Sequence, residues 1–482
     1  MQEIAIIGAG PGGIAAARWL KAQGFFPRLF EAHDALGGQW AHDNPSSGIW
    51  PGMVTNTFAD GTRFSDQPWP EGTALFPHNA DVLAYMRRYA EAHGLLEHTQ
   101  FGCRLTLIEQ SDNGYALTFE QSGQERTEHF ARVVIASGRF NKPVIPPIPG
   151  VDAFTGAHGV VHSFNYKNPD LYRDCDVVVA GGSISALEIA SDLSMLGAAS
   201  VRLTQRRQRY VNPKMVTGVP LEYFSFTYDR AVLCLDADNA ALAASDESLV
   251  HEIAGDPSRY GAPKPHADFA RAGVTGSQHY LNLVAEGRVK PVPWIMAIDG
   301  RRVTFEDGQC ADVDGIIAAT GFALNLPFLS DDMRQTLHVS DGNITLDEFT
   351  FHPDLPGLAF VGLWSQMGSY PVPLEQQARF LAYCWGGVIQ RGQSDMRAGL
   401  KACRAEGHHQ GYHRQNEMAL RFARLCGTDP MGQVDDGLMR RVRQSATTGI
   451  IYRLAGPDAL PDARAEFDAQ FEHYRHTADA EV

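Results

Sequence analysis

Three glycines near the start of the chain have the spacing of a phosphate-binding turn. The segment Gly8-Ala-Gly-Pro-Gly-Gly13 follows a short apolar run at 4–7. The first glycine permits a tight turn, the second lets a pyrophosphate approach the backbone, and the third lets a helix pack closely against the strand. The amides at the N-terminus of that helix would face the phosphates. We therefore predict a dinucleotide site formed by Gly8, Gly10, Pro11, Gly12 and Gly13.

An acidic residue, Glu31, ends the next predicted strand at 25–30. A carboxylate at this position accepts hydrogen bonds from both ribose hydroxyls, which predicts a nucleotide without a 2′-phosphate. The downstream Gly37-Gly38-Gln39-Trp40 is similar to the glycine pair of flavoproteins that bind FAD at this turn. Gly38, Gln39 and Trp40 therefore join the predicted FAD site. A loop around a buried tryptophan is the structural alternative.

A second glycine turn follows a second buried-strand pattern at 177–180. Gly181 corresponds to the first glycine, Ser183 stands at the second glycine position and Ala186 at the third, with Ser185 between them. The substitutions leave two interpretations open, a second nucleotide site or a helix start that binds nothing. The repeated strand–turn–helix order favours a second nucleotide site.

The position equivalent to Glu31 in this repeat is Thr204, which is neutral, and Arg206 and Arg207 follow it. Guanidinium groups in place of an acid supply the charge and the paired donors that a 2′-phosphate requires. This pattern predicts NADPH at the second site, whereas a solvated basic loop is the alternative. The two sites together predict FAD and NADPH as cofactors, with hydride passing from nicotinamide to flavin.

These motifs need buried parallel strands and helices to position them. The chain has 482 residues, of which 44% are hydrophobic, enough for two or three domains. We predict an α/β fold with two Rossmann-like dinucleotide-binding domains. The NADPH domain, 169–311, is inserted into a discontinuous FAD domain made of 1–168 and 312–482.

The remaining stretches carry weaker patterns. Residues 41–80 are rich in Gly, Pro, Asn and Asp, which predicts a long ordered loop near a site. Strand-like segments at 104–135 predict an antiparallel meander. We predict helices at 80–95, a polar loop at 235–275 and mostly helices at 374–482.

Composition excludes several functions. The net charge of −15 argues against nucleic-acid binding and against docking on anionic membranes. No apolar run reaches 18 residues and no CxxC is present, so we expect neither a membrane span nor a zinc or iron–sulfur site. His408, His409 and His413 lack accompanying carboxylate or cysteine ligands, which favours a solvated face over a metal site. We expect a soluble cytoplasmic protein that binds no metal.

The chain resembles the flavin-containing monooxygenases, within the class B flavoprotein monooxygenases, over roughly residues 1–390. The likeness is carried by five segments: GAGPGG, LGGQW, VTNTFADGTRFSDQPWP at 54–70, LTQRRQRYV at 203–211 and GLAFVGLWSQMGSYPVPLEQQARF at 357–380. The resemblance implies that Thr55 and Asn56 lie beside the reactive flavin. It also assigns Thr320 and Gly321, of an A-T-G segment, to the FAD site.

The linker signature of this family is similar to the segment that begins at Phe154 and Gly156 and ends at His162 and Tyr166. Five residues separate Gly156 from His162, two more than in the family pattern. The Baeyer–Villiger subgroup ends this signature with Trp-Pro. Since Tyr166-Lys167 stands here instead, the resemblance favours oxygenation of a heteroatom.

The resemblance implies a mechanism in which NADPH reduces FAD and oxygen adds at flavin C4a. NADP⁺ then shields the C4a-hydroperoxyflavin until an amine nitrogen or sulfide sulfur of a small molecule takes one oxygen atom. Asn56 is the predicted catalytic residue, as a donor to the peroxide or to the nicotinamide end of NADP⁺. An Asx-turn is the alternative for this side chain.

Two alternative functions remain: Baeyer–Villiger oxygenation of a ketone, and NADPH–flavin electron transfer without oxygenation. The predicted partners are a small-molecule substrate and O₂. We expect the C-terminal helices either to cap the site or to build the interface of a homodimer.

Overall fold

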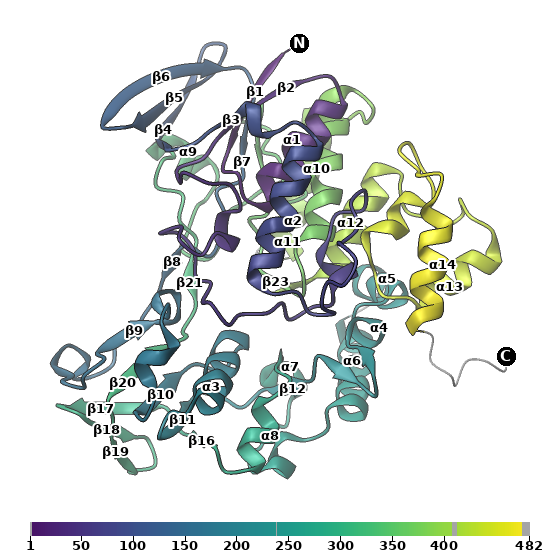
Figure 1. The fold of residues 1–482 in the computed structure, drawn as a ribbon. Coiled ribbons are helices and arrows are strands. Elements are labelled where there is room, and N and C mark those ends of the chain that lie inside the picture. Colours follow the sequence, from purple (N-terminus) through teal and green to yellow (C-terminus); the bar gives the residue numbers. More distant parts are fainter. Residues whose placement is uncertain (1, 238, 407–411, 475–482) are drawn as a thin grey trace.

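The computed structural model describes residues 2–237, 239–406 and 412–474. Two five-stranded parallel sheets form its framework (Figure 1). The first sheet has the order β22-β7-β1-β2-β3, with bounds Leu358–Phe360, Val133–Ile135, Glu3–Ile7, Phe26–Phe30 and Thr99–Gln100. All of its neighbouring strands pair in parallel. The α/β prediction is confirmed.

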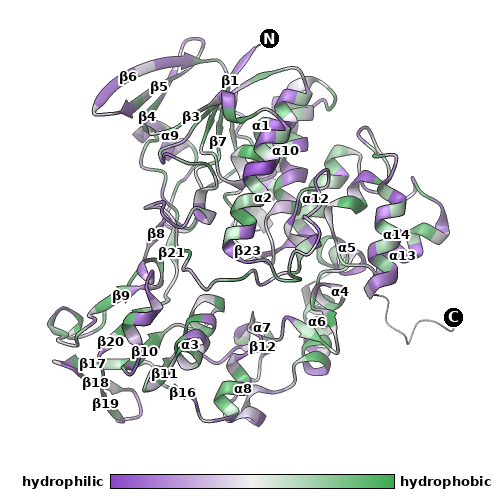
Figure 2. Cartoon of the chain, in the orientation of Figure 1, coloured by the Kyte–Doolittle hydropathy of each residue, from purple (hydrophilic) through white to green (hydrophobic). Residues whose placement is uncertain are grey.

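The central strand β1 is buried along its length after Glu3, as expected for a parallel strand covered on both faces. Helix α1 (Pro11–Ala22) follows it and packs against α10 (Pro371–Gly386). The predicted helix at 80–95 is α2 (Asn79–Ala92). In Figure 2, hydrophobic and hydrophilic residues alternate along α1 and α10.

The second sheet has the order β16-β11-β10-β20-β9, again parallel throughout. Its bounds are Val289–Val292, Ser200–Thr204, Asp176–Ala180, Gly315–Ala318 and Val160–His162. Helices α3 (Ile184–Leu196) and α8 (Tyr280–Ala285) pack together beside it. Strands β9 and β20 come from the stretches 1–168 and 312–482 that the sequence prediction assigned to the FAD domain.

Two short strands join the sheets. Strand β8 (Lys142–Pro143) carries the chain from the first sheet to the second, and β21 (Phe322–Ala323) carries it back. The two pair antiparallel, with Phe322 opposite Pro143. The two crossings therefore lie side by side, as Figure 1 shows.

The predicted meander is confirmed as β4 (Cys103–Ser111), β5 (Gly114–Gln121) and β6 (Gln124–Phe130). Its outer strand β6 is largely hydrophilic (Figure 2). A second antiparallel sheet comprises β17 (Ile295–Asp299), β18 (Arg302–Phe305) and β19 (Cys310–Asp312). Short strand pairs complete the fold: β12 (Tyr210–Asn212) with β15 (Val274–Gly276), β13 (Met215–Val216) with β14 (Val219–Pro220), and β23 (Gln366–Met367) with β24 (His413–Arg414).

The prediction of a polar loop at 235–275 is wrong for much of that stretch. Helix α6 (Asn239–Ile253) and the short α7 (Phe269–Ala272) lie within it, after α4 (Glu222–Ser225) and α5 (Tyr228–Asp236). The sequence of α6, NAALAASDESLVHEI, has alanine-rich turns without a clear apolar stripe. The high helix propensity of alanine therefore favours a helix here, although the apolar residues lack the helical periodicity that would predict one from the sequence.

The mainly helical C-terminal part is confirmed, with α11 (Gln393–Glu406), α12 (Gln415–Cys426), α13 (Asp436–Gln444) and α14 (Ala463–Tyr474) after the short α9 (Asp331–Thr336) and α10. Helix α12 packs against both α10 and α5. Helix α5 of the predicted inserted segment, 169–311, therefore contacts the C-terminal helices. Within the described ranges, no helix combines the length and the hydropathy needed to cross a membrane.

Candidate functional site

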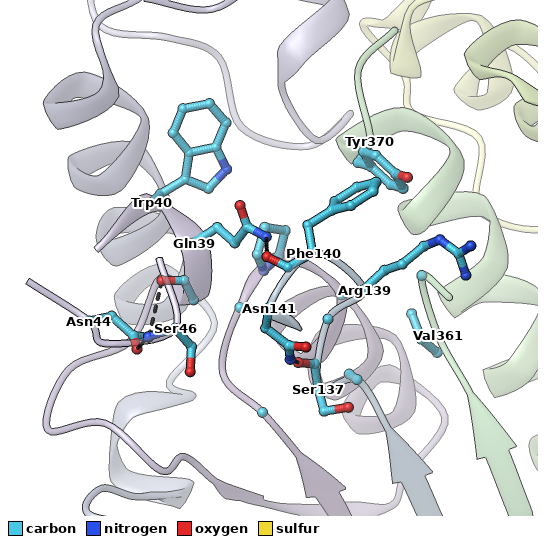
Figure 3. Close-up of a pocket in the computed structure, with 18 of the residues that line it drawn as sticks. Gln39, Trp40, Asn44, Ser46, Ser137, Arg139, Phe140, Asn141, Val361 and Tyr370 are labelled. Atoms are coloured by element: carbon cyan, nitrogen blue, oxygen red, sulfur yellow. Dashed lines mark hydrogen bonds between the residues drawn. The ribbon is translucent and has the colours of Figure 1, made fainter. Parts of the chain in front are cut away.

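A cavity of about 770 Å³ lies at the carboxyl ends of the first sheet (Figure 3). Its walls come from the turn after β1, the segment 38–57, the turn after β7 and the start of α10. Crevices at the carboxyl ends of parallel strands are where open α/β sheets bind ligands. The volume lies in the range of cofactor pockets.

The first glycine turn forms one wall through Gly8, Gly10, Pro11 and Gly12. Gly8 has φ +103°, and a Cβ there would lie 2.6 Å from the carbonyl oxygen of Ala136. Gly13 does not line the cavity, but a Cβ there would collide with the carbonyl oxygen of Gly8. The turn thus requires glycine for the packing reasons that the sequence pattern predicts.

Glu31 is buried at the wall of the cavity, directly beside this turn. Its Oε2 accepts a hydrogen bond from the backbone N–H of Ala9 at 2.7 Å, and its Oε1 accepts one from the N–H of His33 at 2.9 Å. The two amides fix the carboxylate where the nucleotide ribose is expected. Each oxygen keeps lone-pair capacity for a ribose hydroxyl.

The Gly37-Gly38-Gln39-Trp40 turn touches the first glycine turn. The N–H of Gly37 donates to the carbonyl of Ala9 at 2.9 Å, and a Cβ on Gly38 would lie 2.9 Å from the Cα of Gly10. Gln39 Nε2 donates to the carbonyl of Phe140 at 2.8 Å, as Figure 3 shows. Gly38, Gln39 and Trp40 all line the cavity.

Four buried polar atoms of lining residues have no hydrogen-bond partner among the residues described: His33 Nδ1, Asn56 Oδ1, Ser137 Oγ and Asn141 Oδ1. A buried polar atom without a partner is costly, so such atoms point to a ligand. Because Oδ1 of Asn56 accepts no backbone bond, the Asx-turn alternative is not formed. Together with the close glycine turns, these atoms fit a large polar ligand such as FAD.

The second glycine turn repeats the geometry of the first. The N–H of Gly181 donates to the carbonyl of Thr204 at 2.9 Å, as that of Gly8 donates to Phe30 at 2.8 Å. Gly181 has φ +149°, and a Cβ there would collide with the carbonyl of Ala319. Ser183 is the N-cap of α3, which contains the two other predicted residues, Ser185 and Ala186. Of this motif's residues, Ile184 lines the cavity.

Arg206 and Arg207 are exposed just beyond the end of β11. The guanidinium of Arg206 lies 4.8 Å from the ring centroid of Trp294, and Nη1 of Arg207 donates to the carbonyl of Arg271 at 2.9 Å. In the part of the chain that the structure covers, neither guanidinium forms an ion pair with a carboxylate. Their charge is therefore available to a phosphate.

Thr320 and Gly321, which the sequence analysis assigned to the FAD site, do not line this cavity. They follow β20 of the second sheet and lie outside the lining residues. The equivalent turn of the first sheet, after β7, supplies Ser137, Gly138, Arg139 and Asn141 instead. The sequence does carry a signal for this second turn, because Ala136-Ser-Gly138 has the same pattern as Ala319-Thr-Gly321.

The linker residues pack at the crossing between the sheets, outside the cavity. Nε2 of His162 lies 3.0 Å from the carbonyl oxygen of Gly321, and Nδ1 accepts from the N–H of Phe164 at 3.1 Å. These bonds define the Nε2-protonated tautomer. Burial lowers the pKa of His162, although the Gly321 carbonyl acts in the opposite direction. His162 is therefore neutral at pH 7.

The other linker residues have structural contacts. A Cβ on Gly156 would collide with the ring of Phe154. Tyr166 is buried, and its hydroxyl donates to Asp192 Oδ2 at 3.3 Å. Lys167 donates to the carbonyls of Ser47 and Ile49 at 2.7 Å each, which ties the linker to the loop along the cavity.

No metal centre is formed by the described residues, since no group of three His, Cys, Asp or Glu side chains comes together in them. The predicted solvated face without a carboxylate is wrong for His413, whose side chain is 13% exposed and whose Nδ1 lies 2.8 Å from Oε1 of Glu417, one helical turn further along the chain. His408 and His409 lie outside the described residues.

Two parallel sheets with matching glycine turns, one beside a large cavity and one followed by two exposed guanidinium groups, define a flavoprotein oxidoreductase that uses two dinucleotides. The family model described as "FMO-like: Flavin-binding monooxygenase-like" matches residues 1–422. The chain belongs to this family. It is an NADPH-dependent enzyme with FAD as its flavin cofactor, and it has flavoprotein monooxygenase activity.

Curated relatives agree. The chain is 26% identical to "Flavin-containing monooxygenase 5" of Cavia porcellus over 506 aligned positions, which cover 98% of this chain and 92% of the relative. It is 28% identical to "Flavin-containing monooxygenase 2" of Homo sapiens, over 80% of this chain and 74% of the relative.

Solved structures share the fold. S-allyl-L-cysteine S-oxygenase from Allium sativum has a TM-score of 0.66 at 21% identity, with 98% of this chain and 99% of that one covered. A cyclohexanone monooxygenase also has a TM-score of 0.66, at 18% identity, with 90% and 99% covered.

Proposed function

We propose that the protein uses NADPH and O₂ to oxygenate a soft nucleophile, an amine nitrogen or a sulfide sulfur, of a small molecule. The observation that carries the proposal is Asn56, whose side-chain oxygen is buried at the cavity and has no partner among the residues described. Because no described donor fixes this oxygen, the side chain is free to rotate, and its Nδ2 can donate a hydrogen bond to a bound cofactor where negative charge develops.

The rest of the lining supports a reaction that does not require the protein to deprotonate the substrate. Glu31 is the one carboxylate among the described lining residues. Both of its oxygens already accept backbone hydrogen bonds. Amines and sulfides carry their own lone pair, so they need positioning and exclusion of water more than a general base.

We propose that FAD is held by the first glycine turn, Glu31 and the segments around Gly38 and Thr55. NADPH is held by the turn around Gly181 and by Arg206 and Arg207. Bound FAD supplies the hydride acceptor and the site of oxygen activation. The chain's own contribution is to hold both cofactors, to orient the Asn56 amide and to keep water out.

The test combines product analysis with rapid kinetics on the FAD-loaded protein. Incubation with NADPH, air and either a tertiary amine or a thioether should give an N-oxide or a sulfoxide. After anaerobic reduction and mixing with oxygen, a near-ultraviolet absorbance transient should decay faster when thioether is added. Ester formation from simple ketones would instead establish Baeyer–Villiger chemistry, and dye reduction without any oxygenated product would establish electron transfer.

A further inference from the structure

The backbone on either side of Asn56 is held by two buried side chains from the inserted segment. Lys214 Nζ donates to the carbonyl of Thr55 at 3.2 Å, and Glu222 Oε1 accepts from the N–H of Phe58 at 3.1 Å. Both side chains come from more than 150 positions away in the chain. Neither lines the cavity. They therefore contact the loop that carries Asn56 directly, from outside the cavity.

Lys214 also connects this loop to the second glycine turn. Its Nζ lies 3.4 Å from Oε2 of Glu188, which lies on α3, the helix that begins at that turn. The other oxygen of Glu188 accepts from the hydroxyl of Ser277 at 2.7 Å. Lys214 is only 8% exposed. A short polar chain thus runs from the predicted NADPH-binding helix to the carbonyl of Thr55.

Glu222 is buried, and two tyrosines of an aromatic cluster interact with it electrostatically. It is 1% exposed, and Phe58, Tyr223 and Tyr474 form a cluster with ring centroids 5.0–5.9 Å apart. Its Oε2 has no hydrogen-bond partner in the described chain. The charged or titratable groups that act on it are the Lys214 ammonium and the phenols of Tyr223 and Tyr474.

Burial raises the pKa of Glu222 to about 7, against the opposing effects of its own amide, the Phe58 amide and Lys214. The carboxyl therefore changes charge in the physiological range. As a carboxylate it accepts a charge-assisted bond from Phe58 and attracts Lys214, whereas as a neutral acid it makes a weaker bond.

We propose that Glu222 and Lys214 are positioning residues that hold the Asn56 loop in its productive geometry, with the ionised form of Glu222 giving the firmer hold. This inference rests on the proposed role of Asn56 in oxygenation. Neither residue touches the cavity, so their effect is on the yield of oxygenated product. NADPH consumed without oxygen transfer appears as hydrogen peroxide.

The experiment measures sulfoxide formed and peroxide released per NADPH consumed, with methyl phenyl sulfide as the probe, from pH 6 to 8.5. The FAD content of each variant is measured first. In the wild type, the coupled fraction should rise with pH around a midpoint near pH 7. In E222Q the profile should be flat, with peroxide release at high pH raised on the order of fivefold. The matched control is E97Q, because the Glu97 side chain is 73% exposed.

K214M gives a second, independent signature. Without the nearby ammonium, the carboxylate of Glu222 is less favoured, so the midpoint of the profile should move to higher pH. A purely structural role would not move it. Because the wild-type profile and K214M suffice, the test holds even if E222Q loses FAD.

The possible outcomes distinguish failure of the proposed function from failure of this inference alone. A wild type that yields no sulfoxide or N-oxide refutes the proposed function and this inference with it. A wild type that oxygenates the sulfide with a pH-independent coupled fraction overturns the inference alone. So does an E222Q or K214M profile that matches the wild type.

Discussion

Replacing Glu222 by glutamine should change how the stability of the protein depends on pH. The pKa of this carboxyl is about 7 in the fold and 4.5 as the ordinary value. Between these values the folded chain keeps a proton that the unfolded chain loses. The free energy of unfolding therefore falls as pH rises from 4.5 to 7, and the loss is complete above pH 7.

The size of the effect follows from the same two values. A pKa difference of 2.5 corresponds to about 3 kcal/mol. Glutamine has the same shape, can still accept from Phe58 and carries no charge. Relative to the wild type, E222Q should therefore gain about 3 kcal/mol between pH 4.5 and pH 8. With an unfolding entropy of roughly 1 kcal/mol/K for a chain of this size, the gain in Tm is about 3 °C.

The assay is urea unfolding at pH 5, 6, 7 and 8 with saturating FAD, followed by tryptophan fluorescence. E97Q should keep a constant difference from the wild type over this range. If the difference between E222Q and the wild type is the same at pH 5 and pH 8, the carboxyl does not titrate in this window. The assignment of Glu222 as a buried group that is neutral below pH 7 would then be wrong.

Three further predictions concern the cofactor turns and Asn56. R206A and R207A should each raise the KM for NADPH about tenfold and change the KM for NADH little, because each removes a donor to the 2′-phosphate. Initial rates with both coenzymes measure this. Equal effects on the two KM values would contradict the 2′-phosphate assignment. G13A should purify with little FAD, because the new Cβ collides with the carbonyl of Gly8; a normal flavin-to-protein absorbance ratio would contradict it. N56A should be reduced by NADPH at a normal rate yet release mainly peroxide. Stopped-flow reduction and a peroxide assay measure both, and full coupling in N56A would remove Asn56 from the mechanism.

The first nucleotide turn is predictable from sequence because its constraints are local. Gly8 and Gly13 are required by contacts between residues only a few positions apart or between neighbouring strands. Glu31 follows its strand directly, so its place at the cavity comes with the strand–turn–helix–strand order. The same logic finds Gly181 and the end of β11 in the second unit.

Other parts of the site depend on which distant segments come together. Lys214 and Glu222 reach the Asn56 loop only because the inserted segment folds back onto it, and no local pattern marks them. Thr320 and Gly321 were assigned to the FAD site, but their strand β20 pairs with β10 of the second sheet. Ser137 and Asn141 take the expected place at the cavity because β7 pairs with β1. Strand order, which the sequence pattern does not state, decides which turn lies at the cavity.

Ionised Glu222 lowers the free energy of unfolding of the protein, and this favours a functional reason for its presence. A glutamine there would accept the same bond from Phe58 without the cost of burying charge above pH 7. What glutamine lacks is the charge that attracts Lys214 and strengthens the hold on the loop around Asn56. Proteins retain such unfavourable groups where a site requires them. The gain in stability of E222Q and its loss of coupling should therefore appear together, and over the same range of pH.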